Sequence, residues 1–310
     1  MFLAVVLLIV GAGVLLAGAE SAVRGTSRFA IVTGVSPFVL GALLFGIDIE
    51  GLGAALLAAG RGQTAIAAGE AFGTVVFLFG VGLAFALLLS RGPIPSPAPL
   101  MVVAPSVSVG AAAFAVSDQF VSRIEGLWLV VLYGAYASVV VVQREAVDKR
   151  ARALEHEASE IPGGRGRALL IALLGLAAVY AGAWVLVQGG IRIVSRTGLA
   201  AGFVGAAIVG TLSALDEVFL EVLPVLRGAP ALATGNLFGT VAAFSTVVLG
   251  LAALVHPLAL DAAAEMSFLA AAALYAIVAT VFLARGALSK PVAFVLLACY
   301  VAWLGYTATL

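Results

Sequence analysis

Six carboxylic acids lie deep inside apolar stretches of this 310-residue chain. No lysine or arginine lies at comparable depth to neutralise them. An ionised carboxylate at the centre of a membrane helix costs about 2.5–3.5 kcal/mol even on a lenient scale. We therefore expect these acids to be protonated, hydrated or paired with cations taken from solution. The six are Asp48, Glu50, Glu70, Asp216, Glu217 and Glu221.

The elements that must position these acids are membrane helices. The chain is 63% hydrophobic and 10% charged, with a mean hydropathy of +1.20, whereas about a quarter of a typical soluble domain is charged. A membrane-spanning helix needs about 20 apolar residues. This rule predicts an all-α polytopic membrane protein with ten transmembrane helices. Their expected ranges are 2–20, 29–59, 66–90, 99–117, 126–143, 167–188, 197–226, 231–255, 263–284 and 291–309.

Two of these helices are expected to be bent or broken. The ranges 29–59 and 197–226 are long, rich in glycine and acidic. Discontinuous helices of this kind form binding sites in transporters, because their free backbone groups and helix ends face the ligand.

Several classes of function are excluded by what the chain lacks. Zero net charge gives no reason to expect nucleic acid as a partner. The single Cys299 excludes an intrachain disulfide and a cysteine-based metal site. There is no GxxxxGK[ST] segment for ATP and no HExxH segment, and the two histidines lie at helix ends or in linkers. We therefore expect a membrane transporter without a cofactor, and not an enzyme.

The two halves of the chain repeat one another. "RGQTAIAAGEAFGTV" (61–75) aligns with "RGAPALATGNLFGTV" (227–241) at an offset of 166 residues, whereas glycines upstream align at 164. The second half therefore has two extra residues between Gly210 and Asp216. We divide the chain into a first five-helix repeat (1–143), a linker (144–166) and a second five-helix repeat (167–310).

The odd number of helices in each repeat predicts that the halves insert with opposite orientation. Inverted repeats of this kind are typical of secondary transporters, whose binding sites lie near the membrane midplane where the halves meet.

The repeat brings polar residues into register. At the offset of 166, Glu50 falls on Asp216, Glu70 on Asn236, and Thr74 on Thr240. Carboxylate, amide and hydroxyl oxygens are hard ligands, which suit Ca²⁺, Mg²⁺ or Na⁺. The candidate cation ligands are Glu217, Glu50, Glu70, Asp216, Asn236, Asp48, Thr240 and Thr74.

A structural role remains open for some of these polar residues. Any buried carboxylic acid can simply be protonated and bonded to a neighbouring helix. This alternative has equal weight for Glu221, whose repeat partner is Ala55, and it also applies to Asp48, whose partner is Ala214. The threonines can equally be hydroxyls that pack between helices.

On these residues the chain resembles the calcium:cation antiporter superfamily, which includes the sodium/calcium exchangers. The family carries an acidic "GTSLPE"-like segment, followed eighteen residues after the acid by "GNxxGS". Here Glu217 lies eighteen residues before Gly235, and "GNLFGT" (235–240) is similar to the second motif. The resemblance implies that Glu217 is the main ion-binding carboxylate of the second half and that Thr240 replaces a serine ligand.

The first half departs from the family pattern. The same spacing back from Gly69 reaches Gly51 instead of an acid, so that Glu50 comes one residue early and Asp48 is additional. The asparagine of the second motif is replaced by Glu70.

A second departure affects both halves. Exchangers often carry a further polar ligand four residues after the serine, and those positions are Leu78 and Phe244 here. The number of ions, the choice between Na⁺ and H⁺, and Ca²⁺ itself are therefore open. Extra carboxylates favour proton coupling slightly, because a carboxylate can exchange a metal ion for a proton.

We expect a cation antiporter that exchanges a divalent cation, with Ca²⁺ as first candidate, for Na⁺ or H⁺ by alternating access at a midplane carboxylate site. The glycine-bearing helices 2–20 and 167–188 are candidates to slide as the gate. A cation channel or uniporter, and a monovalent cation/proton antiporter on the same scaffold, remain alternatives. The oligomeric state is not predicted.

The basic residues predict the orientation in the membrane. Twelve of the sixteen lysines and arginines fall on the side that holds the linker 144–166. Because cytoplasmic loops carry the excess of positive charge, we expect a cytoplasmic linker, both termini outside and a multi-pass protein of the plasma (inner) membrane.

Overall fold

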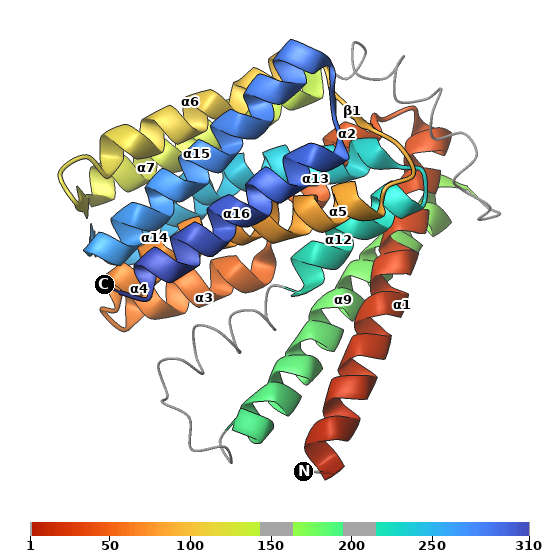
Figure 1. The fold of residues 1–310 in the computed structure, drawn as a ribbon, viewed down its shortest axis with the longest axis horizontal. Helices are drawn as coiled ribbons and strands as arrows, with labels where there is room; N and C mark the ends of the chain where they lie inside the picture. Colours follow the sequence, from red (N-terminus) through yellow and green to blue (C-terminus); the bar gives the residue numbers. More distant parts are fainter. Residues whose placement is uncertain (1, 143–163, 195–214, 310) are drawn as a thin grey trace.

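The computed structural model describes residues 2–142, 164–194 and 215–309. The linker predicted at 144–166 lies almost wholly outside these residues, as does the first part of the helix predicted at 197–226. The described chain is helical apart from short loops and two pairs of two-residue strands (Figure 1).

The first half begins with one long helix and continues with a broken one. Its elements are α1 (Phe2–Thr33), α2 (Pro37–Leu40), the π-helical η1 (Gly41–Phe45), α3 (Ile49–Gly60), α4 (Thr64–Phe77), the π-helical η2 (Leu78–Gly82), α5 (Leu83–Leu89), β1 (Ile94–Pro95), α6 (Pro99–Ala115), β2 (Phe120–Val121) and α7 (Arg123–Val142).

The second half has a closely similar order of elements. They are α9 (Arg165–Val194), α12 (Leu215–Leu226), α13 (Pro230–Ala243), the π-helical η4 (Phe244–Val248), α14 (Leu249–Val255), β3 (Leu258–Ala259), α15 (Ala262–Arg285), β4 (Ala287–Leu288) and α16 (Lys290–Thr307).

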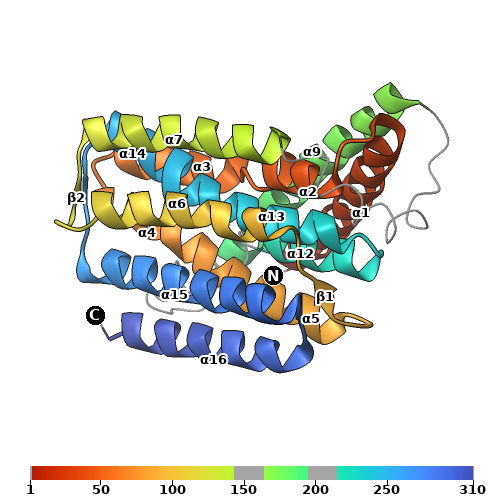
Figure 2. The ribbon, with the colours of Figure 1, turned by 90° about the horizontal axis from the view of Figure 1, so that it is seen from above.

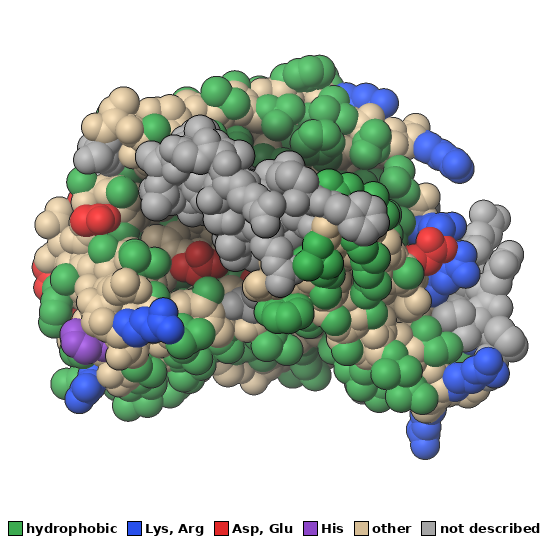
Figure 3. Space-filling view, turned by 90° about the horizontal axis from the view of Figure 1, so that it is seen from below, with side chains coloured by type: hydrophobic (Ala, Val, Ile, Leu, Met, Phe, Trp, Pro, Cys, Tyr) green, Lys and Arg blue, Asp and Glu red, His purple; other side chains and the backbone are tan. Residues whose placement is uncertain are grey.

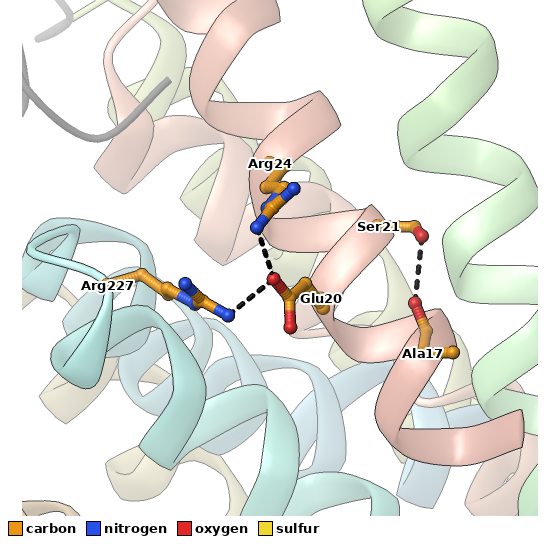
Figure 4. A network of polar contacts seen from close by, with 5 residues as sticks. All are labelled: Ala17, Glu20, Ser21, Arg24 and Arg227. Atoms are coloured by element: carbon orange, nitrogen blue, oxygen red, sulfur yellow. Dashed lines mark hydrogen bonds and ion pairs between the residues drawn. The ribbon is translucent and has the colours of Figure 1, made fainter. Parts of the chain in front are cut away.

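The first helix is longer than the sequence predicts. It was expected to end at residue 20, but α1 continues to Thr33, where Gly34 adopts a positive φ of 71° and ends it. The charges just beyond the apolar span are paired, because Glu20 contacts Arg24 at 2.5 Å and also Arg227, in the turn after α12 (Figure 4).

The predicted break in the second helix is confirmed. Helical structure runs through α2 and η1 to Phe45, is absent at residues 46–48, and resumes in α3 at Ile49. Asp48 stabilises the new helix start, because its Oδ2 accepts a hydrogen bond from the Gly51 N–H at 2.9 Å. The break leaves backbone groups of two helix ends without intrahelical partners in the middle of the bundle.

The third helix of each half has the same construction. The segments α4–η2–α5 (64–89) and α13–η4–α14 (230–255) each contain 14 α-helical, 5 π-helical and 7 α-helical residues. Each boundary in the second lies 166 residues after its counterpart in the first, the same offset as the sequence repeat. A single π-helical turn inside an α-helix is rare and often occurs at functional sites.

Two strand pairs join loops of the first half to loops of the second. Strand β1 pairs antiparallel with β4, and β2 pairs antiparallel with β3. The two pairs lie at opposite ends of the helix bundle, in which α7, α6, α15 and α16 form successive rows (Figure 2).

Helix α13 lies at the centre of the bundle, and nearly all of it is buried. It meets the broken second helix backbone to backbone, because glycines face one another there. A Cβ atom placed on Gly41 would lie 2.2 Å from the Leu232 carbonyl oxygen, and one placed on Gly235 would lie 2.2 Å from that of Phe38. Side chains larger than hydrogen are thereby excluded from this contact.

Helices α1 and α9 run side by side at an angle to the bundle (Figure 1). Their backbones also approach through glycines: a Cβ on Gly25 would lie 2.3 Å from the Ala172 nitrogen, and one on Gly175 would lie 2.2 Å from the Ala22 nitrogen. These two helices therefore form a tightly joined pair.

Seven of the described helical segments are long and apolar enough to cross a membrane. Large apolar side chains such as Phe114, Trp128 and Trp184 are exposed on the outside of the molecule, as expected for a lipid-facing surface. The protein is thus a polytopic helical membrane protein, and the count of ten spans stays a prediction.

Candidate cation-binding site

Three acids of α12 are buried together. Asp216 and Glu217 lie in the first turn of the helix and Glu221 one turn later, and their exposed fractions are 2%, 2% and 0%. Acids in the first turn are stabilised by the partial positive charge of the helix N-terminus. That effect is about 0.3–1 kcal/mol, far smaller than the cost of burying a charge, so further partners are needed.

Asn236 of α13 lies between two of these acids. Its Nδ2 donates a hydrogen bond of 3.4 Å to Glu221 Oε2, and its side chain also lies within electrostatic reach of Glu217. Thr240 follows one turn later on α13, and both residues are fully buried. Helices α12 and α13 therefore face each other with polar side chains inside an apolar core.

Four oxygens of this group have no hydrogen-bond partner among the described residues, although they are shielded from solvent. They are Glu217 Oε2, Glu221 Oε1, Asn236 Oδ1 and Thr240 Oγ1. Each buried oxygen without a partner costs about 1–3 kcal/mol, and more when it is charged. All four oxygens can act as ligands to a hard cation.

The first half contributes acids from its broken helix and from α4. Asp48, which is 6% exposed, lies within electrostatic reach of Glu217 and of Glu70. Glu70 is partly exposed, and Thr74 lies one turn after it on α4, also partly exposed. Figure 3 shows an acidic side chain set in a hollow of an otherwise largely apolar face, beside residues that are not described.

Within the described residues, the two ion pairs both involve Glu20, far along the sequence from these acids. The same residues contain no group of three or more histidine, cysteine, aspartate or glutamate side chains arranged to hold a metal ion. The site is therefore a mixed set of carboxylate, amide and hydroxyl oxygens.

Comparison with known families decides what kind of protein this is. The model of the sodium/calcium exchanger protein family matches residues 3–142 and 167–308. The chain belongs to the sodium/calcium exchanger family. It is accordingly a membrane transporter of the cation-exchanger type.

Individual relatives agree with this assignment. The chain is 26% identical over 269 residues to the "Putative antiporter CaxA" of Alkalimonas amylolytica. The aligned region covers 85% of this chain and 84% of the relative. Its fold is similar to structures of the sodium-calcium exchanger NCX_Mj, with 98% of both chains covered. The TM-score is 0.83 at 20% identity for a form soaked with 10 mM Na⁺ and zero Ca²⁺, and 0.84 at 20% identity for one soaked with 2.5 mM Na⁺ and 0.1 mM Ca²⁺.

The predicted ligands of this exchanger fall into three groups. Asp216, Glu217, Asn236, Thr240 and Asp48 are all buried, and Asp48, Asp216 and Asn236 lie within electrostatic reach of Glu217, whereas Glu70 and Thr74 on α4 are partly exposed. The backbone of Glu50 lies in the first turn of α3, but its side chain is outside the described residues. Its role as a ligand stays a prediction.

Two residues outside the predicted ligand set lie near these acids. One is Glu221, for which the sequence leaves a structural role open because the repeat aligns it with Ala55. Tyr180 of α9 lies within electrostatic reach of Asp48, Asp216 and Glu217 and contacts the backbone at Ile49. A tyrosine in an apolar helix carries no functional signature, although its position on the predicted gate helix is a signal that could have found it.

Phe244 occupies a place where exchangers often have a polar ligand. A Cβ atom placed on Gly51 would lie 2.9 Å from Cζ of Phe244 and 2.5 Å from Oδ2 of Asp48, so the ring packs against the start of α3. Leu78, its counterpart in the first half, is fully buried. Apolar packing has thus replaced polar ligands at both positions.

Proposed function

We propose that this exchanger is an antiporter that carries a divalent cation, with Ca²⁺ as the first candidate, in exchange for Na⁺ or H⁺. The observation that carries the proposal is the group of four buried oxygens without hydrogen-bond partners on α12 and α13. Other buried polar atoms of the described chain also lack partners, but here four oxygens lie on two helices that pack together, and a bound cation would complete their coordination.

The charge of the site favours a divalent substrate. Asp216 and Glu217 are adjacent on α12, and Asp48 lies within reach of Glu217. Several neighbouring carboxylates repel one another, so an ion of two positive charges relieves more repulsion than a single Na⁺. The oxygen-only ligand set matches Ca²⁺, which takes 6–8 oxygens at about 2.3–2.6 Å.

The ligands that we assign to the divalent ion come from four segments. The charge comes from Glu217, Asp216, Asp48, Glu70 and Glu50, and neutral oxygens come from Asn236, Thr240 and Thr74. Carbonyl groups at residues 46 and 47, where the helix is interrupted, supply further oxygens.

Alternating access follows from the cost of moving the empty site. An occupied site is close to neutral and can be enclosed in the apolar core, whereas the empty site carries charges that are expensive to bury. The protein therefore changes conformation only with a cation bound, and this requirement couples the two ion fluxes. We assign the moving part to α1 and α9, which form a pair outside the bundle and bring Tyr180 to the acids.

The same proposal includes the inverted five-helix repeats, a plasma-membrane location and a cytoplasmic 144–166 segment. The matched construction of 64–89 and 230–255 supports the repeat. The excess of basic residues supports the orientation.

Ion flux in liposomes that contain the purified protein tests the proposal. We expect radioactive Ca²⁺ to enter only when Na⁺ or H⁺ is more concentrated inside than outside. Glu217→Gln should lower the initial rate by more than about 100-fold, because removing even a group that only supports a metal ligand costs 10–100-fold. The matched control is Asp118→Asn, the same chemical change at an exposed loop carboxylate, which should transport like the wild type.

The assay also separates the remaining alternatives. Ca²⁺ entry without a counter-gradient would identify a channel or uniporter. Na⁺ or K⁺ exchange for H⁺ with no Ca²⁺ flux would identify a monovalent cation/proton antiporter. Wild-type transport by Glu217→Gln under every cation tested would show that the site is assigned wrongly.

A further inference from the structure

Among the described acids that the divalent site does not use, Glu221 is the most deeply buried. Its side chain is 0% exposed, and its Oε1 has no hydrogen-bond partner. It lies one turn beyond Glu217 on α12, and a Cβ atom placed on Gly82 of the π-helical segment η2 would lie 3.7 Å from its Cβ, an ordinary van der Waals contact. Its free oxygen is therefore available to a ligand from outside the chain.

Its neighbours complete a small set of oxygens. Asn236 Nδ2 donates to Glu221 Oε2 at 3.4 Å, which holds the amide beside the carboxylate while its own Oδ1 stays without a partner. Thr240 lies one turn further along α13, and its Oγ1 is also buried and without a partner. Three free oxygens from two helices are thus available in one dry region of the core.

The charge of the oxygens around Glu221 differs from the charge around Asp216 and Glu217, one helical turn earlier on α12. Glu221 supplies one negative charge, and the amide and hydroxyl oxygens supply none. Because a net charge in an apolar core is costly, a monovalent cation matches this set, whereas a divalent cation would leave one positive charge uncompensated. At Asp216 and Glu217, with Asp48 in reach, the negative charge is in excess and suits a divalent ion.

We propose that Glu221, Asn236 and Thr240 form a separate subsite for a monovalent metal cation of the Na⁺ type, one helical turn from the divalent site. The inference rests on the proposed exchange function and adds to it a place for the counter-ion. Asn236 and Thr240 are ligands shared by the two subsites, and Glu221 belongs to the monovalent subsite alone. Occupation of one subsite therefore weakens the other through shared oxygens and like charge.

Equilibrium binding of radioactive Na⁺ and Ca²⁺ to the purified full-length protein in detergent tests this subsite. We expect Glu221→Gln to bind one Na⁺ fewer per protein than the wild type, or to raise the Na⁺ concentration for half-saturation by at least about 10-fold. Ca²⁺ binding measured without Na⁺ should stay within about twofold of wild type. Asp118→Asn serves as the matched control, and elution on size exclusion with a thermal melt verifies that each variant is folded.

A second variant keeps the test decisive if Glu221→Gln does not fold. Glu221→Asp retains the charge on a shorter side chain, and we expect weakened Na⁺ binding with intact Ca²⁺ binding. Unchanged Na⁺ binding by a folded Glu221 variant would overturn the subsite. If Na⁺ binding is unchanged but the pH profile of Ca²⁺ transport is altered, the occupant is a proton and the proposed Na⁺ subsite is wrong. Failure of the exchange function itself would appear differently, as a wild-type protein without gradient-driven Ca²⁺ flux.

Discussion

Helices α4 and α13 are built alike but carry different chemistry at equivalent positions. Both contain 14 residues and continue into a π-helical turn 166 residues apart. Glu70 on α4 is partly exposed and ionisable, whereas Asn236 on α13 is fully buried and cannot ionise. The same backbone thus presents a carboxyl group at the edge of the core in one half and an amide at its centre in the other.

The difference shows where this exchanger can place negative charge. Asn236 faces Glu217 and Glu221 on α12, so a third carboxylate in its place would face two others without water. Glu70 has Asp48 within electrostatic reach, and its partial exposure lowers the cost of that repulsion. Symmetry of the backbone is therefore retained, while the symmetry of charge is broken by burial.

Asn236→Asp should break this arrangement most severely. The new carboxylate would lose the amide donor to Glu221 and add like charge in the dry core, and an uncompensated buried charge costs about 3–5 kcal/mol. We expect a large fall in the melting temperature of the ion-free protein, partly restored by Ca²⁺. Thermal melts with and without Ca²⁺ measure both effects, and equal melting of variant and wild type in the ion-free state would contradict the buried position of Asn236.

Glu70→Asn makes α4 resemble α13 and should have a smaller effect. Since Glu70 is partly exposed, the fold should be little affected, but the divalent site loses one charge. We expect the Ca²⁺ concentration for half-maximal transport to rise by about 10-fold, with a melting temperature near that of the wild type. If the Ca²⁺ concentration for half-maximal transport is unchanged, Glu70 is not a ligand, and Asn236 is the only ligand at this pair of equivalent positions.

Glu20→Gln should have the smallest effect on stability. Glu20 is the partner of Arg24 and Arg227 (Figure 4), and Arg227 is the repeat counterpart of Arg61, which is exposed. Exposed ion pairs contribute about 0.2–1 kcal/mol each, so the melting temperature should fall by only a few degrees. The transport rate should change more than with Arg61→Gln, because Glu20 joins α1 to the turn after α12. Equal transport rates for the two variants would show that this network is irrelevant to movement of α1.

The sequence predicts several membrane helices well because they depend on strong local patterns. Apolar runs place the segments 64–89 and 230–255 and helix α15 within a few residues, whereas the choice of Asn236 and Thr240 as ligands, made from "GNLFGT", stays a prediction. The end of α1 is predicted wrongly, because the ion pairs of Glu20 compensate the polar residues that otherwise mark the end of a span.

The rest of the site depends on how helices cross, which local patterns do not encode. Whether Glu221 faces Asn236 is set by the position of α12 against α13, and the repeat gives no help because Glu221 aligns with Ala55. The contribution of Tyr180 likewise depends on the angle at which α9 approaches the broken helix. The π-helical turns have no sequence signature that would have located them.

The strand pairs at the two ends of the bundle bear on how the chain folds. Each pair takes one strand from either half, α4 packs against α15, and α13 packs against η1. Neither half can bury its own central helix without elements that are made from the other half of the chain. The two halves therefore form one cooperative folding unit. The acids of the first half reach their final surroundings only after the second half has been synthesised and inserted.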